Sequence, residues 1–251
     1  MGLLLGFIII LLMTGIFFLV KGKQNNMKNL VILGFGFIAI PIGFIGRFLF
    51  NLTQVFQEYF VFLGFVSLVI FTNMTFYKNR MKKPNLILLI VIILGIIQIV
   101  LFHMFYEIEI NRGFEYYLRV SLDLPYNLLV FNWLAFSCYS AYRRLEDQDI
   151  EPWIKARYKL VAIFSFILGF ISVPEFFQPK NVMWGNPNNL ISLIIFGITA
   201  VLAIIYAIGF ALSWFMPKWL RSYFNKGYKR ELEREYTEDE LMSLIKNQLN
   251  E

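Results

Sequence analysis

Residues 85–106 read NLILLIVIILGIIQIVLFHMFY and contain no Asp, Glu, Lys or Arg. A helix of this length rises about 33 Å at 1.5 Å per residue, which matches the ~30 Å hydrocarbon core of a bilayer. An uncharged apolar run of this length is too long for a core helix of a water-soluble domain. We therefore predict a transmembrane helix at these residues.

The same pattern recurs along the whole chain. Of its 251 residues, 58% are hydrophobic and only 16% are charged, whereas a soluble domain carries nearer a quarter charged residues. Seven apolar segments can be counted, at 2–20, 29–50, 57–77, 85–106, 120–142, 158–176 and 189–216. The sequence therefore predicts an all-α, polytopic protein of the cell membrane with a bundle of seven transmembrane helices.

The distribution of basic residues predicts how this bundle is oriented. Of the 23 Lys and Arg residues, 19 flank one set of segment ends or lie in the tail. The other side has four: Arg47, Arg112, Arg119 and Lys180. The positive-inside rule places the N-terminus outside and the C-terminus inside. Because the net charge of +6 lies beside the spans, we expect the lipid bilayer, and not nucleic acid, to be the partner of these charges.

The chain divides into a seven-helix domain, residues 1–216, and a cytoplasmic tail, residues 217–251. After Pro217, basic residues interleave with an apolar set that consists of Trp219, Leu220, Tyr223 and Phe224. This pattern is typical of a helix that lies in the membrane interface, with aromatic rings towards the lipid and basic groups towards phosphates.

A second helix is predicted further along the tail. Thr237 and Glu240 form a capping box, in which Thr is the N-cap and Glu is the N3 residue. One face of the helix that follows carries Leu241, Leu244, Ile245 and Leu249. An isolated helix this short is marginal in water. We therefore expect this face to dock on the protein's own loops or to bind a partner protein; the alternative is that the helix frays.

Arg47 is a candidate ligand-binding residue in the second segment. A charged group in a bilayer costs about 3 kcal/mol or more, so each such group is a candidate functional residue. Arg47 shares a helix face with Gly36 and Gly43, which favours a position inside the bundle against a closely packed neighbour. Arg47 could anchor an anionic ligand that enters from outside. The alternatives are a snorkelling side chain or an ion pair with Glu58, Glu107 or Asp123.

The fifth segment has the strongest polar face of the chain. At helical spacing this face carries Arg119, Asp123, Asn127 and Cys138, and Pro125 lies within the same segment. Arg119 and Asp123 could simply pair as i, i+4 neighbours. The sharper hypothesis is a water-filled pocket that opens to the outside and binds a ligand through Arg47, Arg119, Asp123 and Asn127.

The seventh segment carries polar groups at intervals of seven residues, which are Ser192, Thr199, Tyr206 and Ser213. Hydroxyl and small residues at such intervals favour helix–helix contacts. Enzyme chemistry is not predicted, since the chain has one cysteine, one histidine and no recognisable catalytic, nucleotide or metal motif. We therefore expect no cofactor and no metal site.

Two stretches resemble a known family. IEPWIKARYKLVAIFSF (150–166) brings a basic Lys/Arg-Tyr step into the sixth segment, and GFIGRFLF (43–50) surrounds Arg47. Together they resemble the seven-span sensor region found ahead of some prokaryotic histidine kinases. The resemblance implies a membrane sensor that passes a signal to cytoplasmic domains. This chain departs from that pattern, because its only histidine lies in a predicted span and no glycine-rich ATP-binding motif follows.

The leading hypothesis is therefore a receptor-like or sensor protein that signals through a separate cytoplasmic partner. Ligand binding would act by shifting the packing of the fifth to seventh helices. The alternatives are a small seven-helix transporter or channel, which needs a polar path to the inner side, and a structural subunit of a membrane complex.

Overall fold

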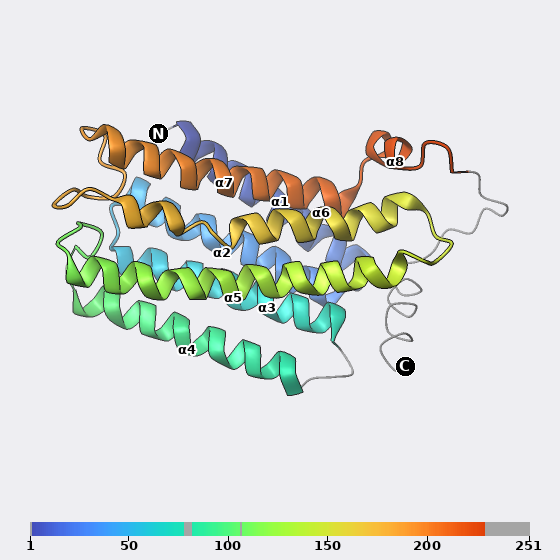
Figure 1. Ribbon diagram of the computed structural model, residues 1–251, viewed down its shortest axis with the longest axis horizontal. Coiled ribbons are helices and arrows are strands. Elements are labelled where there is room, and N and C mark those ends of the chain that lie inside the picture. The colour runs from blue at the N-terminus through green and yellow to red at the C-terminus, as the bar shows by residue number, and fades with distance from the viewer. Residues whose placement is uncertain (1, 78–81, 106, 229–251) are drawn as a thin grey trace.

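The computed structural model describes residues 2–77, 82–105 and 107–228 (Figure 1). Within these ranges the chain is helical, and the β-structure is a single bridge between Ile110 and Met183. The elements are α1 (Gly2–Gln24), α2 (Lys28–Phe50), α3 (Gln54–Phe76), α4 (Lys82–Met104), α5 (Phe114–Leu145), α6 (Pro152–Leu168), the 3-10 helix η1 (Val173–Phe177), α7 (Leu190–Phe215) and α8 (Lys218–Phe224).

The helices α1 to α7 run side by side along one long bundle, and consecutive helices point in opposite directions (Figure 1). We call one end the N-terminal end, because α1 begins there; it also carries the α2–α3, α4–α5 and α6–α7 connections. The other end carries the α1–α2 and α5–α6 connections together with α8. We call it the basic end, because Lys21, Lys23, Arg143 and Arg144 lie there.

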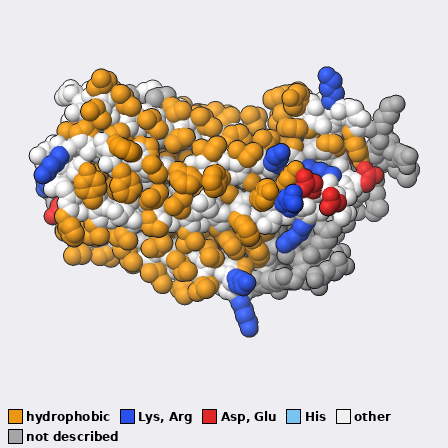
Figure 2. Space-filling model, viewed as in Figure 1, with side chains coloured by type: hydrophobic (Ala, Val, Ile, Leu, Met, Phe, Trp, Pro, Cys, Tyr) orange, Lys and Arg blue, Asp and Glu red, His pale blue; other side chains and the backbone are white. Residues whose placement is uncertain are grey.

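In the described part of the chain, six helices are long and apolar enough to cross a membrane. They are α1, α2, α3, α4, the stretch Pro152–Phe177 that contains α6, and α7. Large apolar side chains such as Ile9, Phe136 and Leu190 are exposed on the outside of the bundle, and Figure 2 shows hydrophobic side chains along most of its length, with Lys and Arg gathered towards its ends. This surface is compatible with a multi-pass membrane protein.

The fifth predicted segment, 120–142, is longer in the structure, where α5 has 32 residues. It carries more polar residues than the other long helices and is not among the six apolar ones. Its polar side chains nevertheless face the interior, since Arg119 and Asn127 are buried, whereas Phe136 and Tyr139 are exposed. Pro125 lies inside the helix without ending it.

The sixth predicted segment, 158–176, is not one continuous helix. The α6 helix ends at Leu168, a turn follows, and η1 begins at Val173. Pro174 has no backbone N–H to donate, and its ring would collide with the carbonyl four residues earlier, so it disfavours a regular α-helix at this point. This break turns Ser172 and Glu175 towards α5.

Glycine residues bring the first three helices into close contact. A Cβ atom added to Gly34 of α2 would lie 2.8 Å from the carbonyl oxygen of Gly15 in α1. A Cβ atom added to Gly43 would lie 2.9 Å from the carbonyl oxygen of Gln57 in α3. Because backbones approach this closely, no larger residue fits without movement. The glycine face expected in the second segment therefore does mark a packed interface.

The predicted interfacial helix corresponds to α8, which exposes Trp219 and Tyr223. The helix is held against the α5–α6 connection and the first turn of α6. Asn225, which follows α8, donates to Glu151 over 3.2 Å and accepts a hydrogen bond of 3.2 Å from the backbone N–H of Trp153. The guanidinium of Arg221 lies 4.4 Å from the centre of the Trp153 ring. The second tail helix, with Leu241, Leu244, Ile245 and Leu249, falls outside the described residues.

Candidate functional site

A cavity of about 220 Å³ lies between the helices, and it reaches from the N-terminal end past the middle of the bundle. All seven long helices contribute to its walls. Most of the lining is apolar, with Phe7, Phe44 and Phe196 among the aromatic residues. Polar side chains enter it from α3, from α5 and from the connections at the N-terminal end. An apolar cavity with a few converging polar groups is typical of a small-molecule site.

Two connections close over this end of the bundle and are tied to each other. The backbone N–H of Trp184 donates to the carbonyl of Glu109 over 3.2 Å, beside the bridge between Ile110 and Met183. The side chain of Asn111 donates to the Gln178 carbonyl over 2.6 Å. The α4–α5 and α6–α7 connections therefore form one cap.

Arg47 forms a buried ion pair beneath this cap. Its guanidinium donates to both carboxylate oxygens of Glu109 and to the side-chain carbonyl of Gln57, the latter over 2.9 Å. The exposed fractions of the Arg47 and Glu109 side chains are 10% and 8%. Glu109 and Gln57 line the cavity, whereas Arg47 stands behind them and is not among the lining residues. Arg47 therefore forms an ion pair, which was one of the alternatives expected from the sequence. Its partner Glu109 was not among the expected ones.

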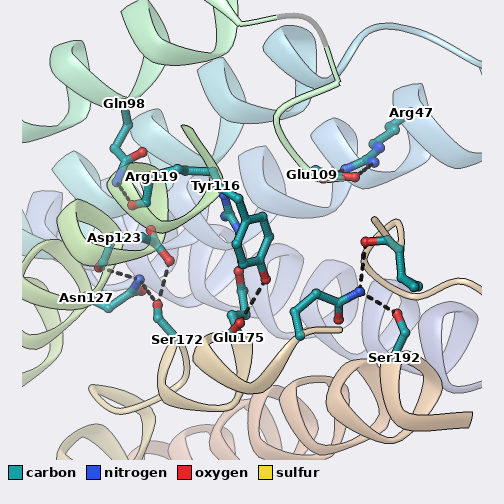
Figure 3. A network of polar contacts seen from close by, with 12 residues as sticks. Arg47, Gln98, Glu109, Tyr116, Arg119, Asp123, Asn127, Ser172, Glu175 and Ser192 are labelled. Carbon is teal, nitrogen blue, oxygen red and sulfur yellow. Dashed lines mark hydrogen bonds and ion pairs between the residues drawn. The ribbon is translucent and has the colours of Figure 1, made fainter. Parts of the chain in front are cut away.

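Arg119 is held by Glu175, and not by Asp123 one helical turn away. The Arg119 guanidinium donates to the Glu175 carboxylate, and both side chains are close to nine-tenths buried (Figure 3). The hydroxyl of Tyr116 donates to the Glu175 backbone carbonyl over 2.9 Å. This pair joins the first turns of α5 to η1, because the break after Leu168 brings η1 to that position.

Asp123 takes part in a separate set of hydrogen bonds. The hydroxyl of Ser172 donates to its carboxylate over 2.5 Å, and the amide of Asn127 donates to Ser172 over 2.8 Å (Figure 3). The same amide donates to the backbone carbonyl of Asp123 over 2.9 Å. Arg119, Asp123, Asn127, Ser172 and Glu175 all line the cavity.

Glu58 adds a further carboxyl group from α3. It lines the cavity and interacts electrostatically with the carboxyl groups of Asp123 and Glu109 and with the guanidinium groups of Arg119 and Arg47. None of the hydrogen bonds or ion pairs found among the described residues reaches its carboxyl group. The cavity region therefore holds four carboxyl groups against two guanidinium groups, and each guanidinium is already paired.

The cavity does not continue to the basic end. Below it lies a layer of aromatic side chains, in which Phe18, Phe71 and Phe210 are fully buried and Trp214 is almost so. The ring centres of Phe71 and Trp214 are 5.3 Å apart, and those of Phe18 and Phe210 are 5.8 Å apart. Rings packed at these distances leave no passage for a solute.

Three of the four predicted ligand-binding residues come together at the cavity, namely Arg119, Asp123 and Asn127. Arg47 does not line the cavity and contacts two residues that do, Glu109 and Gln57. Cys138, expected on the same face of the fifth helix, is fully buried in the core and does not line the cavity. In the described part of the chain, no three His, Cys, Asp or Glu side chains are placed to hold a metal ion.

The sequence interpretation named Glu58 only as a possible partner of Arg47, and it did not name Glu109 or Glu175. Each of the three lies near the end of an apolar segment or just outside one, so it resembled an ordinary flanking residue. A usable signal was present, because Arg47 and Arg119 lie inside or at the edge of predicted spans and acidic residues lie at the same end. Buried charges are generally paired, so an inward-facing Arg47 or Arg119 calls for such a carboxylate.

Neither a protein-family model, nor a curated protein, nor a solved structure matches this chain.

Proposed function

We propose that the protein is a receptor-like or sensor protein of the cell membrane, which binds a small ligand in the cavity and signals through a separate cytoplasmic partner. The observation that carries the proposal is a cavity closed on one side, because the buried layer around Phe71 and Phe210 separates it from the basic end. A cavity that ends inside the bundle suits detection better than passage.

In this proposal α5 crosses the membrane in addition to the six apolar helices. The N-terminus lies outside and the C-terminus lies inside. The interior position of Arg119 and Asn127 supports a crossing by α5, since lipid would meet mainly its apolar side. The basic residues on the connections between consecutive helices support the orientation, since such residues are retained on the cytoplasmic side.

The contacts of the cavity suggest how a signal would leave it. Asp123 on α5 and Ser172 after α6 are hydrogen-bonded to each other, so a ligand that contacts either side chain acts on both helices. These helices meet again at the basic end, where the α5–α6 connection contacts α8. A ligand that prefers one arrangement of α5 and α6 would shift the equilibrium between arrangements and so move the surface offered to the partner.

Accessibility of a single thiol tests this proposal. In a Cys138→Ala background, Ala200→Cys places a thiol on the cavity wall, and Gly197→Cys places one at a similar depth where an added Cβ meets no atom within 4 Å. We expect membrane-impermeant thiol reagents to modify the Ala200→Cys protein from the N-terminal side of oriented vesicles only. The Gly197→Cys protein, with its thiol towards lipid, is the control and stays unmodified.

The second candidate function is a carrier, and the two surplus carboxyl groups of the cavity favour it, because such groups accompany proton or cation movement in transporters. A carrier opens alternately to both sides. Modification of the Ala200→Cys protein from both sides, together with solute uptake into vesicles that depends on Asp123, would replace the sensor proposal by this one.

A further inference from the structure

Two carboxyl groups of the cavity form no ion pair among the described residues. Arg47 neutralises Glu109, and Arg119 neutralises Glu175, which leaves Glu58 and Asp123. Asp123 accepts a hydrogen bond from Ser172, whereas no hydrogen bond or ion pair among the described residues reaches Glu58. A carboxylate in an apolar environment is unfavourable unless a positive group or hydrogen-bond donors compensate its charge.

The side chain of Tyr126 adds an aromatic surface beside these carboxyl groups. It lines the cavity, is 3% exposed and packs its ring at 5.2 Å from that of Phe65. Its hydroxyl lies 2.8 Å from where a Cβ atom on Gly95 of α4 would stand, and its electrostatic neighbours are Glu58 and Asp123. An aromatic ring beside two carboxyl groups favours a positive group with an apolar body.

The remaining walls define the rest of the ligand. Phe7, Phe44 and Phe196 offer apolar surface, which a strongly hydrated inorganic ion cannot use. An anion would meet the surplus negative charge. A positive group attached to an apolar body satisfies both parts of the cavity, since aromatic faces also attract cations.

We infer that the cavity binds a monovalent organic cation with an apolar body, whose positive group is accepted by Glu58 with Asp123 nearby. This inference rests on the proposed function, because it names the class of ligand for the same cavity. It assigns to Glu58 a role that differs from that of Glu109 and Glu175, whose charges hold arginines.

The experiment uses the full chain with Cys138→Ala and Ala200→Cys in vesicles. The rate of modification is measured with two methanethiosulfonate reagents of similar size, one that carries a trimethylammonium group and one that carries a sulfonate group. The ratio of the two rates is divided by the same ratio measured for free mercaptoethanol. Because a cleft of one sign concentrates counter-ions by about 10-fold or more, we expect a normalised ratio of roughly ten in favour of the cation. Glu58→Gln should bring the ratio close to one, whereas the exposed Glu107→Gln leaves it unchanged.

A protection measurement does not depend on any change at Glu58. Phenethylammonium should slow the modification. Uncharged 2-phenylethanol at the same concentration should protect the thiol about tenfold less, because recognition of the charge worth 1.4 kcal/mol corresponds to a tenfold difference in affinity. Equal rates for the two reagents, or equal protection by the two phenyl compounds, would overturn the cation inference and leave the sensor proposal standing. A thiol that neither reagent reaches from either side would overturn both.

Discussion

Arg119 on α5 and Glu175 in η1 form a buried ion pair across 56 residues of sequence, and this pair fixes the broken end of the sixth span against the fifth helix. Their side chains are 9% and 12% exposed, so water screens the interaction poorly. The pair forms one wall of the cavity and is also a structural contact between two helices.

Loss of one partner of this pair should destabilise the protein strongly. We expect Glu175→Gln to lower the free energy of unfolding by about 3–5 kcal/mol, because Arg119 would remain charged and buried without a carboxylate. Thermal unfolding of the purified protein in detergent measures the change. Replacement of both residues, as Arg119→Met with Glu175→Met, should recover most of the loss; a double variant as unstable as the single one would argue against the ion-pair explanation.

Arg47 should behave as a structural residue. From the sequence it was a candidate anchor for a ligand, and its pairing with Glu109 predicts instead that Arg47→Ala costs about 3–5 kcal/mol of stability. The matched control is Arg112→Ala at the same end, whose pair with Glu107 is exposed and worth about 1 kcal/mol or less. If Arg47→Ala unfolds at the same temperature as the unmodified protein but alters ligand binding, Arg47 anchors a ligand and is not mainly a structural residue.

Close packing of α1 on α2 makes Gly34 sensitive to the smallest side chain. The added Cβ atom of Gly34→Ala would lie 2.8 Å from both the Gly15 carbonyl oxygen and the Leu19 backbone nitrogen, so the helices must separate. We expect a loss of about 1–3 kcal/mol, measured by thermal unfolding. Gly197→Ala is the control, where an added Cβ meets open space and the helix gains about 0.5–1 kcal/mol. Identical behaviour of the two variants would mean that this contact is looser than described.

The attachment of α8 should depend on Asn225. Its side chain accepts from the Trp153 backbone N–H and donates to Glu151 over 3.2 Å, so Asn225→Ala removes both links to the α5–α6 connection. We expect faster amide hydrogen exchange in Lys218–Phe224 and unchanged exchange in α1, measured by mass spectrometry. Tyr223→Ala, at a side chain that is largely exposed, should leave exchange in α8 unchanged.

The sequence was informative where local pattern and burial agree. Apolar blocks predicted every long helix, and the hydroxyl line from Ser192 to Ser213 is buried as expected for a helix–helix contact. The expected glycine face of the second segment packs on its neighbour through Gly36 and Gly43. These features depend on periodicity along a single helix, which a sequence displays directly.

The partners of Arg47 and Arg119 could not be predicted from periodicity along a single helix. Glu109 lies 62 residues from Arg47, in a connection, and Glu175 reaches Arg119 from η1, after the sixth helix has ended at Leu168. Such pairs arise from the way distant segments pack, and helical spacing considers only neighbours three or four residues apart. The role of Glu58 likewise depends on a cavity that no single segment contains.

The length of α5 has a mechanical consequence. At 1.5 Å per residue its 32 residues measure about 48 Å, which exceeds the ~30 Å of hydrocarbon by several helical turns. In this helix Asp123 is the tenth residue, about a third of the way along, and Arg143 lies in the last turn. Under the proposed function, a small tilt of α5 imposed beside Asp123 would displace the Arg143 end sideways, so α5 would act as a lever.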